Sequence, residues 1–257
     1  MRTARVAHAG AIHPAVPHAA GVQLADGRVL AEHEVVWLPP VEAGTIVALG
    51  LNYADHVKEL ARELTVTSKD EPLVFFKTAG ALVGHRGHTV RPAGVQFMHY
   101  ECELAVVIGR PAWRVKARDA LAHVAGYAVC NDYAVRDYLE NWYRPNLRVK
   151  NRDRATALGP WLVSAGEVPD PQALALRTSV NGVVRQQGFT SNMVHSVAEL
   201  IEYLSHFMTL APGDVILTGT PEGVANVDVG DEVVCEIDGI GRLVNHLVAP
   251  APETAST

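Results

Sequence analysis

The chain has 257 residues, 48% of them hydrophobic and 19% charged, which is the composition of a globular protein with a substantial core. Its formal net charge of −6 argues against a general nucleic-acid surface, and no apolar run approaches the roughly 20 residues that span a bilayer. Residues 1–10 lack the continuous apolar core of a signal peptide. The three cysteines lie far apart within apolar runs, so we expect free thiols in a reducing cytoplasm.

The predicted elements begin with a small β-rich leader over residues 1–45, in which Asp26-Gly27 suits a hairpin turn. Residues 45–56 predict a buried strand that leads into a helix near Tyr53–Leu64. Further strands are expected over Pro72–Lys77, Glu101–Ile108 and residues 125–135, and then a hairpin that turns at Asn181-Gly182.

The clearest predicted helix lies within residues 196–210, where Ser196 and Glu199 form a capping box. One apolar stripe along this helix consists of Leu200, Ile201, Leu204, Phe207 and Met208. Strands within 212–220, 230–241 and 242–248 close the chain, and residues 250–257 are expected to fray. Strands dominate without regular alternation with helices, which indicates a β-rich α+β fold with a curled sheet.

The segment HYECELAVVIG, residues 99–109, places two glutamates in an otherwise apolar strand. Since side chains alternate between the faces of a strand, Glu101 and Glu103 share one face, and the apolar residues that follow predict burial on both faces. A buried carboxylate pair costs several kcal/mol unless a positive charge lies between the two groups, and a divalent cation is the simplest such charge. The alternative is that both glutamates lie at a solvent-exposed strand start and bind nothing.

A third candidate ligand is Asp132, which ends another apolar segment, YAVCND. Its alternative role is a turn or a helix cap before the following residues. Three carboxylates would favour Mg²⁺ or Mn²⁺ over zinc, which usually recruits histidine or cysteine.

Four ordered blocks resemble the fumarylacetoacetate hydrolase family, from about Thr45 to Val248: GLNYADHVKEL, HYECELAVVIG, GYAVCNDYAVRDYLE and LTGTPEGV. The resemblance implies a mixed β-sandwich roll with few helices. It implies a catalytic domain over residues 46–249, between the leader at 1–45 and the tail at 250–257. It also implies that Mg²⁺ or Mn²⁺ binds to Glu101, Glu103 and Asp132.

A second set of segments resembles one branch of that family, the isomerase/decarboxylases of homoprotocatechuate (4-hydroxyphenylacetate) catabolism: RDYLENWYRPNLRVKNRD, VNGVVRQQG, FMTLAPGD and GIGRLVN. In that branch the family unit often occurs twice in one polypeptide, and this chain has room for one unit, similar to the C-terminal one. We therefore expect a homodimer or a pairing with a homologous subunit. The expected ligand is a small 2-oxo polycarboxylate, with no nucleic acid and no membrane.

Residues 144–154 carry five basic side chains and one acidic side chain. One interpretation is a solvated basic loop. The other is a wall that binds substrate carboxylates through Arg144, Arg148 and Arg152, since guanidinium groups match carboxylates well. Lys150 follows Asp132 at the family's spacing for an active-site lysine. The resemblance therefore assigns it proton transfer, with a pKa that a nearby cation would lower.

The segment HVKE places His56 and Glu59 on one face if it is helical, and an exposed helix pair is the alternative interpretation. In the family, a His/Glu pair in this block lies on a lid, where it activates water or moves protons. The resemblance carries that catalytic role to both residues. Asn52 and Tyr53, in the same block, are candidate substrate contacts.

Two more candidate substrate contacts follow predicted strands. Lys77 ends the strand in FFKTAG, but Thr78 departs from the proline that usually follows this lysine in the family. In LTGTPEGV, small residues at a strand end would let the backbone approach a ligand, and the resemblance favours Thr220 as the contact.

The chain departs from several acylpyruvate-cleaving members of the family at Leu139, where they carry a glutamine, and this departure weakens the case for hydrolysis. This favours chemistry that needs no water. The resemblance to the isomerase/decarboxylase branch implies a 5-carboxymethyl-2-oxo-hex-3-ene-1,7-dioate decarboxylase and 2-hydroxyhepta-2,4-diene-1,7-dioate isomerase. The alternatives are an acylpyruvate hydrolase, an oxaloacetate decarboxylase, or a metal-binding partner subunit without activity of its own.

Overall fold

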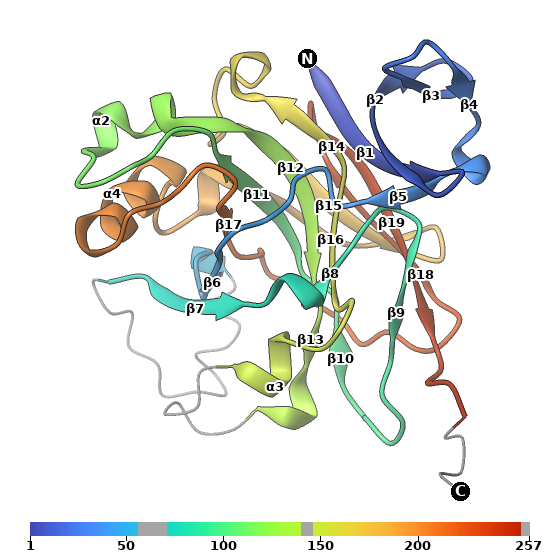
Figure 1. Cartoon of the computed structure of the whole chain (residues 1–257). Helices are drawn as coiled ribbons and strands as arrows, with labels where there is room; N and C mark the ends of the chain where they lie inside the picture. Colours follow the sequence, from blue (N-terminus) through green and yellow to red (C-terminus); the bar gives the residue numbers. More distant parts are fainter. Residues whose placement is uncertain (56–70, 140–145, 253–257) are drawn as a thin grey trace, which may run out of the picture.

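The computed structural model describes residues 1–55, 71–139 and 146–252, and strands dominate these ranges (Figure 1). The strands form a 12-stranded sheet, a five-stranded sheet and a two-stranded ribbon. The α-helices of the described ranges are α2 (Ala117–Ala120), α3 (Leu147–Lys150) and α4 (Val197–Phe207). Short 3₁₀ segments are η1 (Glu32–Glu34), η2 (Ala79–Ala81), η3 (Leu121–His123), η4 (Arg136–Tyr138), η5 (Ala165–Glu167) and η6 (Thr190–Asn192). The β-rich α+β class with few helices is thus confirmed.

The large sheet has the strand order β4-β3-β2-β1-β14-β12-β11-β17-β6-β7, and β5 and β8 pair with β1 and β14 outside this path. Its strands are β1 (Arg2–His8), β2 (Ala11–His18), β3 (Gly21–Leu24), β4 (Val29–Leu30), β5 (Val36–Leu38), β6 (Ile46–Gly50), β7 (Leu73–Lys77), β8 (Leu82–Val83), β11 (Cys102–Ile108), β12 (Val124–Asp132), β14 (Thr156–Ser164) and β17 (Val215–Leu217). The order brings together strands that are far apart in sequence, such as β11 and β17.

The smaller sheet has the order β16-β15-β18-β19-β9, and the ribbon pairs β10 with β13. These strands are β9 (Gly87–Val90), β10 (Met98–His99), β13 (Ala134–Val135), β15 (Ala175–Val180), β16 (Val183–Phe189), β18 (Glu232–Ile237) and β19 (Gly241–Val248). The β15–β16 hairpin turns where predicted. Asn181 and Gly182 have φ values of 50° and 79°, as a tight two-residue hairpin turn requires.

Strand β11 lies in the middle of the large sheet, between β12 and β17, and all of its residues are buried. Leu104 and Val106 belong to one core cluster, whereas Ala105 and Val107 belong to another. Alternate side chains therefore enter separate cores, which confirms the predicted burial on both faces. The three cysteines are buried free thiols, as expected.

The prediction of one continuous strand over residues 125–135 was wrong. Strand β12 ends at Asp132, and β13 begins at Ala134 with a different partner, β10. The Asp132 N–H donates to the Glu101 carbonyl, whereas the Tyr133 N–H donates to the Ala155 carbonyl. The backbone thus changes partners at this point, and Asp132 lies at a strand end within the core.

The N-terminal strands join the large sheet through β1, which pairs with β2, β5 and β14. Trp37 of β5 packs edge-on against Trp161 of β14 and against His85, with ring centroids 5.2 and 5.1 Å apart. In Figure 1, β2, β3 and β4 lie at the upper right of this sheet. The hairpin turn predicted at Asp26-Gly27 joins β3 and β4. A domain boundary at residue 45 stays a prediction.

Helix α4 begins with the predicted capping box, in which the Glu199 N–H donates to Ser196 Oγ and the Ser196 N–H donates to the Glu199 carboxylate. Leu204 is buried as predicted, but Phe207 is 56% exposed. The apolar stripe stops short because the helix ends at Phe207, whose ring packs edge-on against Tyr203. The predicted helix near Tyr53–Leu64 falls mostly outside the described residues. Across the described ranges, no helix is long and apolar enough to cross a membrane.

Candidate metal centre

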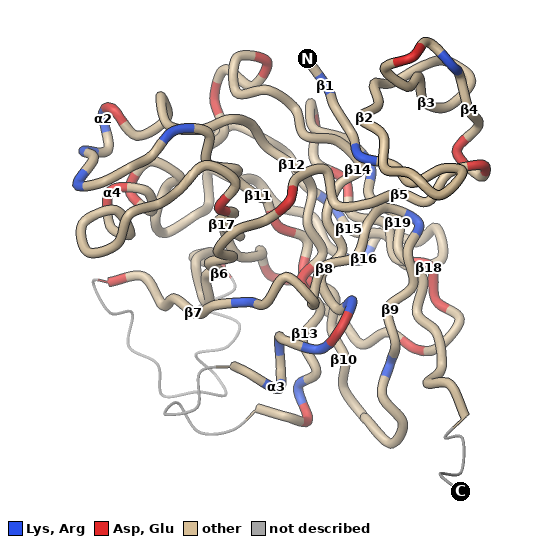
Figure 2. The backbone as a smooth tube through the Cα atoms, viewed as in Figure 1, with Lys and Arg blue, Asp and Glu red and all other residues tan. Residues whose placement is uncertain are grey.

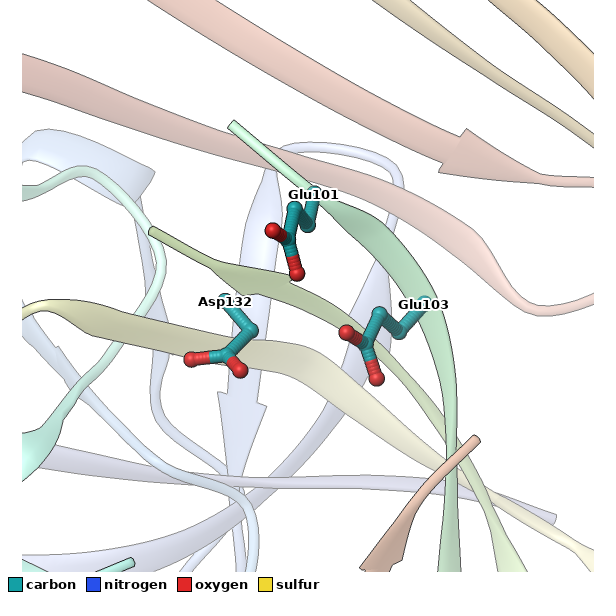
Figure 3. Close-up of side chains that lie close together, drawn as sticks. All are labelled: Glu101, Glu103 and Asp132. Carbon is teal, nitrogen blue, oxygen red and sulfur yellow. The ribbon is translucent and has the colours of Figure 1, made fainter. Parts of the chain in front are cut away.

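Three buried carboxylates meet where β11 and β12 pair (Figure 3). Glu101 immediately precedes β11, Glu103 lies within it, and Asp132 ends β12. One carboxylate oxygen of each residue lies within 4.8 Å of the other two. The three residues predicted as metal ligands are therefore brought together. The interpretation of the two glutamates as a solvent-exposed strand start does not hold.

The antiparallel register explains this meeting. Glu103 pairs with Cys130, and directly opposed residues point to the same face of a sheet. Asp132 lies two residues beyond Cys130, and Glu101 lies two residues before Glu103, so all three carboxylates share that face. The hydrogen bond from the Asp132 N–H to the Glu101 carbonyl, 2.9 Å long, holds the two strands in register at the site.

Two buried lysines neutralise part of this negative charge. Lys150 Nζ donates to Asp132 Oδ2 at 2.9 Å and also forms an ion pair with Glu101. Lys77 Nζ lies 2.7 Å from Asp132 Oδ1, and neither of these two side chains has exposed surface. Burial alone would raise the pKa of Asp132, but the two ammonium groups together lower it. Figure 2 shows basic residues, in blue, on α3 and on β7.

Lys150 itself responds to the carboxylates around it. Burial alone would lower its pKa, yet the charges of Asp132, Glu101 and Glu103 raise it above the ordinary value. A cation bound by the same carboxylates would compete for the charges that raise this pKa. The structure thus gives a raised pKa for Lys150, and the lowering expected near a bound cation stays a prediction.

Arg136 completes the cationic groups around the triad. Its Nη2 donates to Glu101 Oε1 at 2.8 Å, and its Nε approaches His99 Nδ1 at 3.4 Å. The sequence reasoning missed this residue. Its signal was available, because Arg136 follows Asp132 by four residues, in the arginine-aspartate pair that begins η4.

Glu103 is the least neutralised carboxylate. Within the described residues its contacts include the Gly219 N–H, which donates to Oε2 at 2.7 Å, and they include no ion pair. Gly219 has φ +85°, a conformation that favours glycine and that turns its N–H toward Glu103. Burial raises the pKa of Glu103, and the charges of Asp132 and Glu101 raise it further. Three converging buried oxygen ligands, one of which forms no ion pair with any described residue, fit a hard divalent cation.

The other predicted contacts are placed as follows. Arg148 and Arg152 lie over the ring of Tyr138, with guanidinium carbons 4.5 and 5.8 Å from its centroid. Lys77 is buried against Asp132, and its contact with substrate stays a prediction. Thr220 is buried and accepts a hydrogen bond from Gln186 Nε2 at 2.9 Å.

Asn52 and Tyr53 have mainly structural contacts. Asn52 donates to the carbonyls of Thr218 and His195 at 2.9 and 3.1 Å, which ties the loop after β6 to the loop after β17. Tyr53 is fully buried, and its hydroxyl has no hydrogen-bond partner among the described residues. Three predicted residues lie outside the described ranges: His56, Glu59 and Arg144.

The fold and the site together define a β-rich protein with a buried three-carboxylate centre suited to a divalent cation. Residues 45–248 match the family model for the fumarylacetoacetate (FAA) hydrolase C-terminal region. The chain therefore belongs to the fumarylacetoacetate hydrolase family, as the four sequence blocks predict.

Known proteins of this family include one that is 53% identical to the chain over 236 residues, the 4-hydroxyphenylacetate degradation bifunctional isomerase/decarboxylase of Salmonella dublin. The alignment covers 90% of this chain and 54% of that protein, so the chain spans about half the length of this relative.

Solved structures show the same fold over most of the chain. The 5-carboxymethyl-2-hydroxymuconate delta-isomerase from Mycobacterium smegmatis is 36% identical, with a TM-score of 0.84 over 98% of this chain and 100% of that chain. Fumarylpyruvate hydrolase from Pseudomonas aeruginosa, in complex with Mn²⁺ and pyruvate, is 34% identical, with a TM-score of 0.75 over 82% of this chain and 91% of that chain.

Proposed function

We propose that this chain is a divalent-metal-dependent decarboxylase and isomerase of an unsaturated 2-oxo di- or tricarboxylate. The observation that carries the proposal is the buried triad of Glu101, Glu103 and Asp132, with the ammonium of Lys150 in contact with two of its members. The specific reactions are the decarboxylation of 5-carboxymethyl-2-oxo-hex-3-ene-1,7-dioate and the isomerisation of 2-hydroxyhepta-2,4-diene-1,7-dioate, in homoprotocatechuate catabolism. The names of the similar isomerase/decarboxylase and isomerase support this choice.

The three carboxylates are the ligands for the cation, which is Mg²⁺ or Mn²⁺ because the donor set consists of hard oxygens. When bound, the cation supplies Lewis-acid stabilisation of the negative charge that develops as CO₂ leaves. Mn²⁺ in the similar fumarylpyruvate hydrolase supports this assignment.

Proton transfer is the task of Lys150. Its Nζ lies among Asp132, Glu101 and the Asp132 carbonyl, so its proton is held at one defined place beside the triad. Delivery of that proton to a different carbon of the dienolate moves the double bond, which couples decarboxylation to isomerisation. His56 and Glu59 would share this task from a lid. Arg144, Arg148 and Arg152 would hold the distal carboxylates, with Asn52, Tyr53 and Thr220 as further contacts.

Leu139 supports decarboxylation over hydrolysis. Its side chain is apolar and 50% exposed, three residues beyond Arg136, and it offers no group that would orient a water molecule. A cytoplasmic location and a homodimer, or a pair with a homologous subunit, complete the proposal.

The test is to incubate the purified chain with the tricarboxylate substrate and to measure CO₂ release and the ultraviolet absorbance of the diene product. We expect turnover with Mg²⁺ or Mn²⁺ and none after chelation. Equal CO₂ release by the metal-free protein would refute the proposal. Release of pyruvate from an acylpyruvate would indicate the hydrolase instead. The same assay with and without a homologous subunit distinguishes an active enzyme from a partner subunit.

A further inference from the structure

Lys77 is a buried cation for which the proposed mechanism has no use. Its side chain has 0% exposed surface, and its Nζ lies 2.7 Å from Asp132 Oδ1. The same Nζ donates to the backbone carbonyl of Lys150. Lysine is almost never fully buried unless it is paired, because removal of the ammonium from water is costly. The ion pair with Asp132, one of the three candidate metal ligands, offsets that cost.

The residues on both sides of Lys77 are tied to the chain that follows Lys150. The Thr78 N–H donates to Asn151 Oδ1 at 2.7 Å, and Asn151 Nδ2 donates to the Phe76 carbonyl at 3.1 Å. The end of β7 is therefore fastened to the end of α3 on each side of the buried ammonium. This arrangement holds Lys77 against Asp132 and keeps two lysines on one carboxylate.

The charges of the site balance in a way that depends on Lys77. Among the described residues, the three carboxylates are matched by three cationic groups, Lys77, Lys150 and Arg136, all of which contact Asp132 or Glu101. A divalent cation added to this set leaves an excess of two positive charges. A monocarboxylic 2-oxo acid carries one negative charge, whereas its enolate carries two.

We propose that Lys77 is a positioning residue that sets specificity for charge: through Asp132 it gives the metal-loaded site a preference for the dianionic enolate over the monoanionic 2-oxo acid. The inference rests on the proposed function, since it requires the cation at the triad. Without Lys77 the excess falls to one positive charge, and the additional attraction for a second negative charge is lost.

The experiment uses Lys77→Met, which removes the charge and its hydrogen bonds, and Lys77→Gln, which keeps a hydrogen-bond donor without the charge. Mn²⁺ binding is measured by electron paramagnetic resonance. Binding of oxalate, a dianion that mimics the enolate, and of pyruvate, a monoanion, is then measured by calorimetry on the Mn²⁺-loaded proteins. The control is Lys116→Met, which removes a lysine with 68% side-chain exposure that pairs with Glu202.

We expect both variants to bind Mn²⁺ at least as tightly as the wild type, because one repelling charge is gone. We expect the ratio of oxalate to pyruvate affinity to fall about tenfold or more, the effect of one unit charge at several ångströms in a partly buried site. The control should leave both values unchanged.

Four results would overturn the proposal: equal losses for oxalate and pyruvate, weaker Mn²⁺ binding in both variants, a normal affinity ratio in Lys77→Gln, or failure of both variants to fold. Each of these would make Lys77 a structural support. A wild-type protein that binds no Mn²⁺ would instead refute the proposed function, and that result is obtained before any variant is measured.

Discussion

Replacement of Glu103 by glutamine should stabilise the metal-free protein while it abolishes metal binding. Glu103 lies within 4.8 Å of both other carboxylates. At an effective dielectric constant of about 20, two unit charges at that separation repel each other by about 3 kcal/mol, and Lys150 offsets part of the total from two neighbours. We therefore expect Glu103→Gln to raise the free energy of unfolding at neutral pH by about 3 kcal/mol. The amide oxygen of glutamine can still accept the hydrogen bond from Gly219.

The sign of the pH dependence follows from the same residue. Burial raises the pKa of Glu103 in the folded state, so between the unfolded and folded pKa values the folded protein binds more protons than the unfolded chain. The free energy of unfolding therefore falls as pH rises from the unfolded to the folded pKa of Glu103, by about 1.4 kcal/mol for each pH unit. The glutamine variant lacks this contribution.

The assay is urea unfolding of chelator-treated protein from pH 5 to pH 8, followed by tryptophan fluorescence. The stability of the wild type relative to Glu103→Gln should decline with increasing pH. With excess Mn²⁺ the order should reverse, because a bound ion stabilises only the protein that retains its ligands. Parallel stabilities of the two proteins across the pH range would refute the reasoning. Glu236→Gln, which removes a charge from the five-stranded sheet, is the control.

Three further predictions concern single side chains. Lys150→Met should reduce CO₂ release about 10²- to 10⁴-fold and leave Mn²⁺ binding intact, and retained turnover would exclude Lys150 from proton transfer. Burial lowers the pKa of His85 to about 3, and its Nδ1 accepts a hydrogen bond from the Val244 N–H. Above pH 6.5 the neutral His85 should contribute fully to the stability of the metal-loaded protein. Below pH 6.5 the free energy of unfolding should fall by about 1.4 kcal/mol for each pH unit, because the unfolded chain binds a proton that the buried imidazole does not. Urea titrations should show this slope for the wild type and a flatter one for His85→Gln. Ser196→Ala should cost about 1 kcal/mol of unfolding free energy, since it removes the N-cap of α4, and an unchanged urea midpoint would contradict this.

Local rules predicted much of the fold. Period-two alternation placed Glu101 and Glu103 on one face, and the capping box at Ser196 and the turn at Asn181-Gly182 lie where the sequence indicates them. These features depend on contacts between residues a few positions apart. Such rules failed at Asp132, where the backbone leaves its partner strand, because an apolar run contains no signal for the strand with which it will pair.

The environment of the site could not be predicted in the same way. The burial of Lys77 against Asp132 was not predicted, and neither was the contact of Arg136 with Glu101. Both contacts join residues that are more than 30 positions apart in the sequence and that lie in or next to different elements of the fold. Their positions follow from the strand order of the sheet, which no short segment contains.

By itself the sequence determined the chemical character of this protein: two carboxylates on one face of a strand buried on both sides, an aspartate at the end of another apolar run, and family blocks that connect them. Tertiary structure decided that these groups meet, because the register of β11 against β12 brings the three carboxylates to one face. It also decided their electrostatics. Burial and the placement of two lysines and one arginine are long-range properties, and they leave Glu103 as the carboxylate without a cationic partner among the described residues.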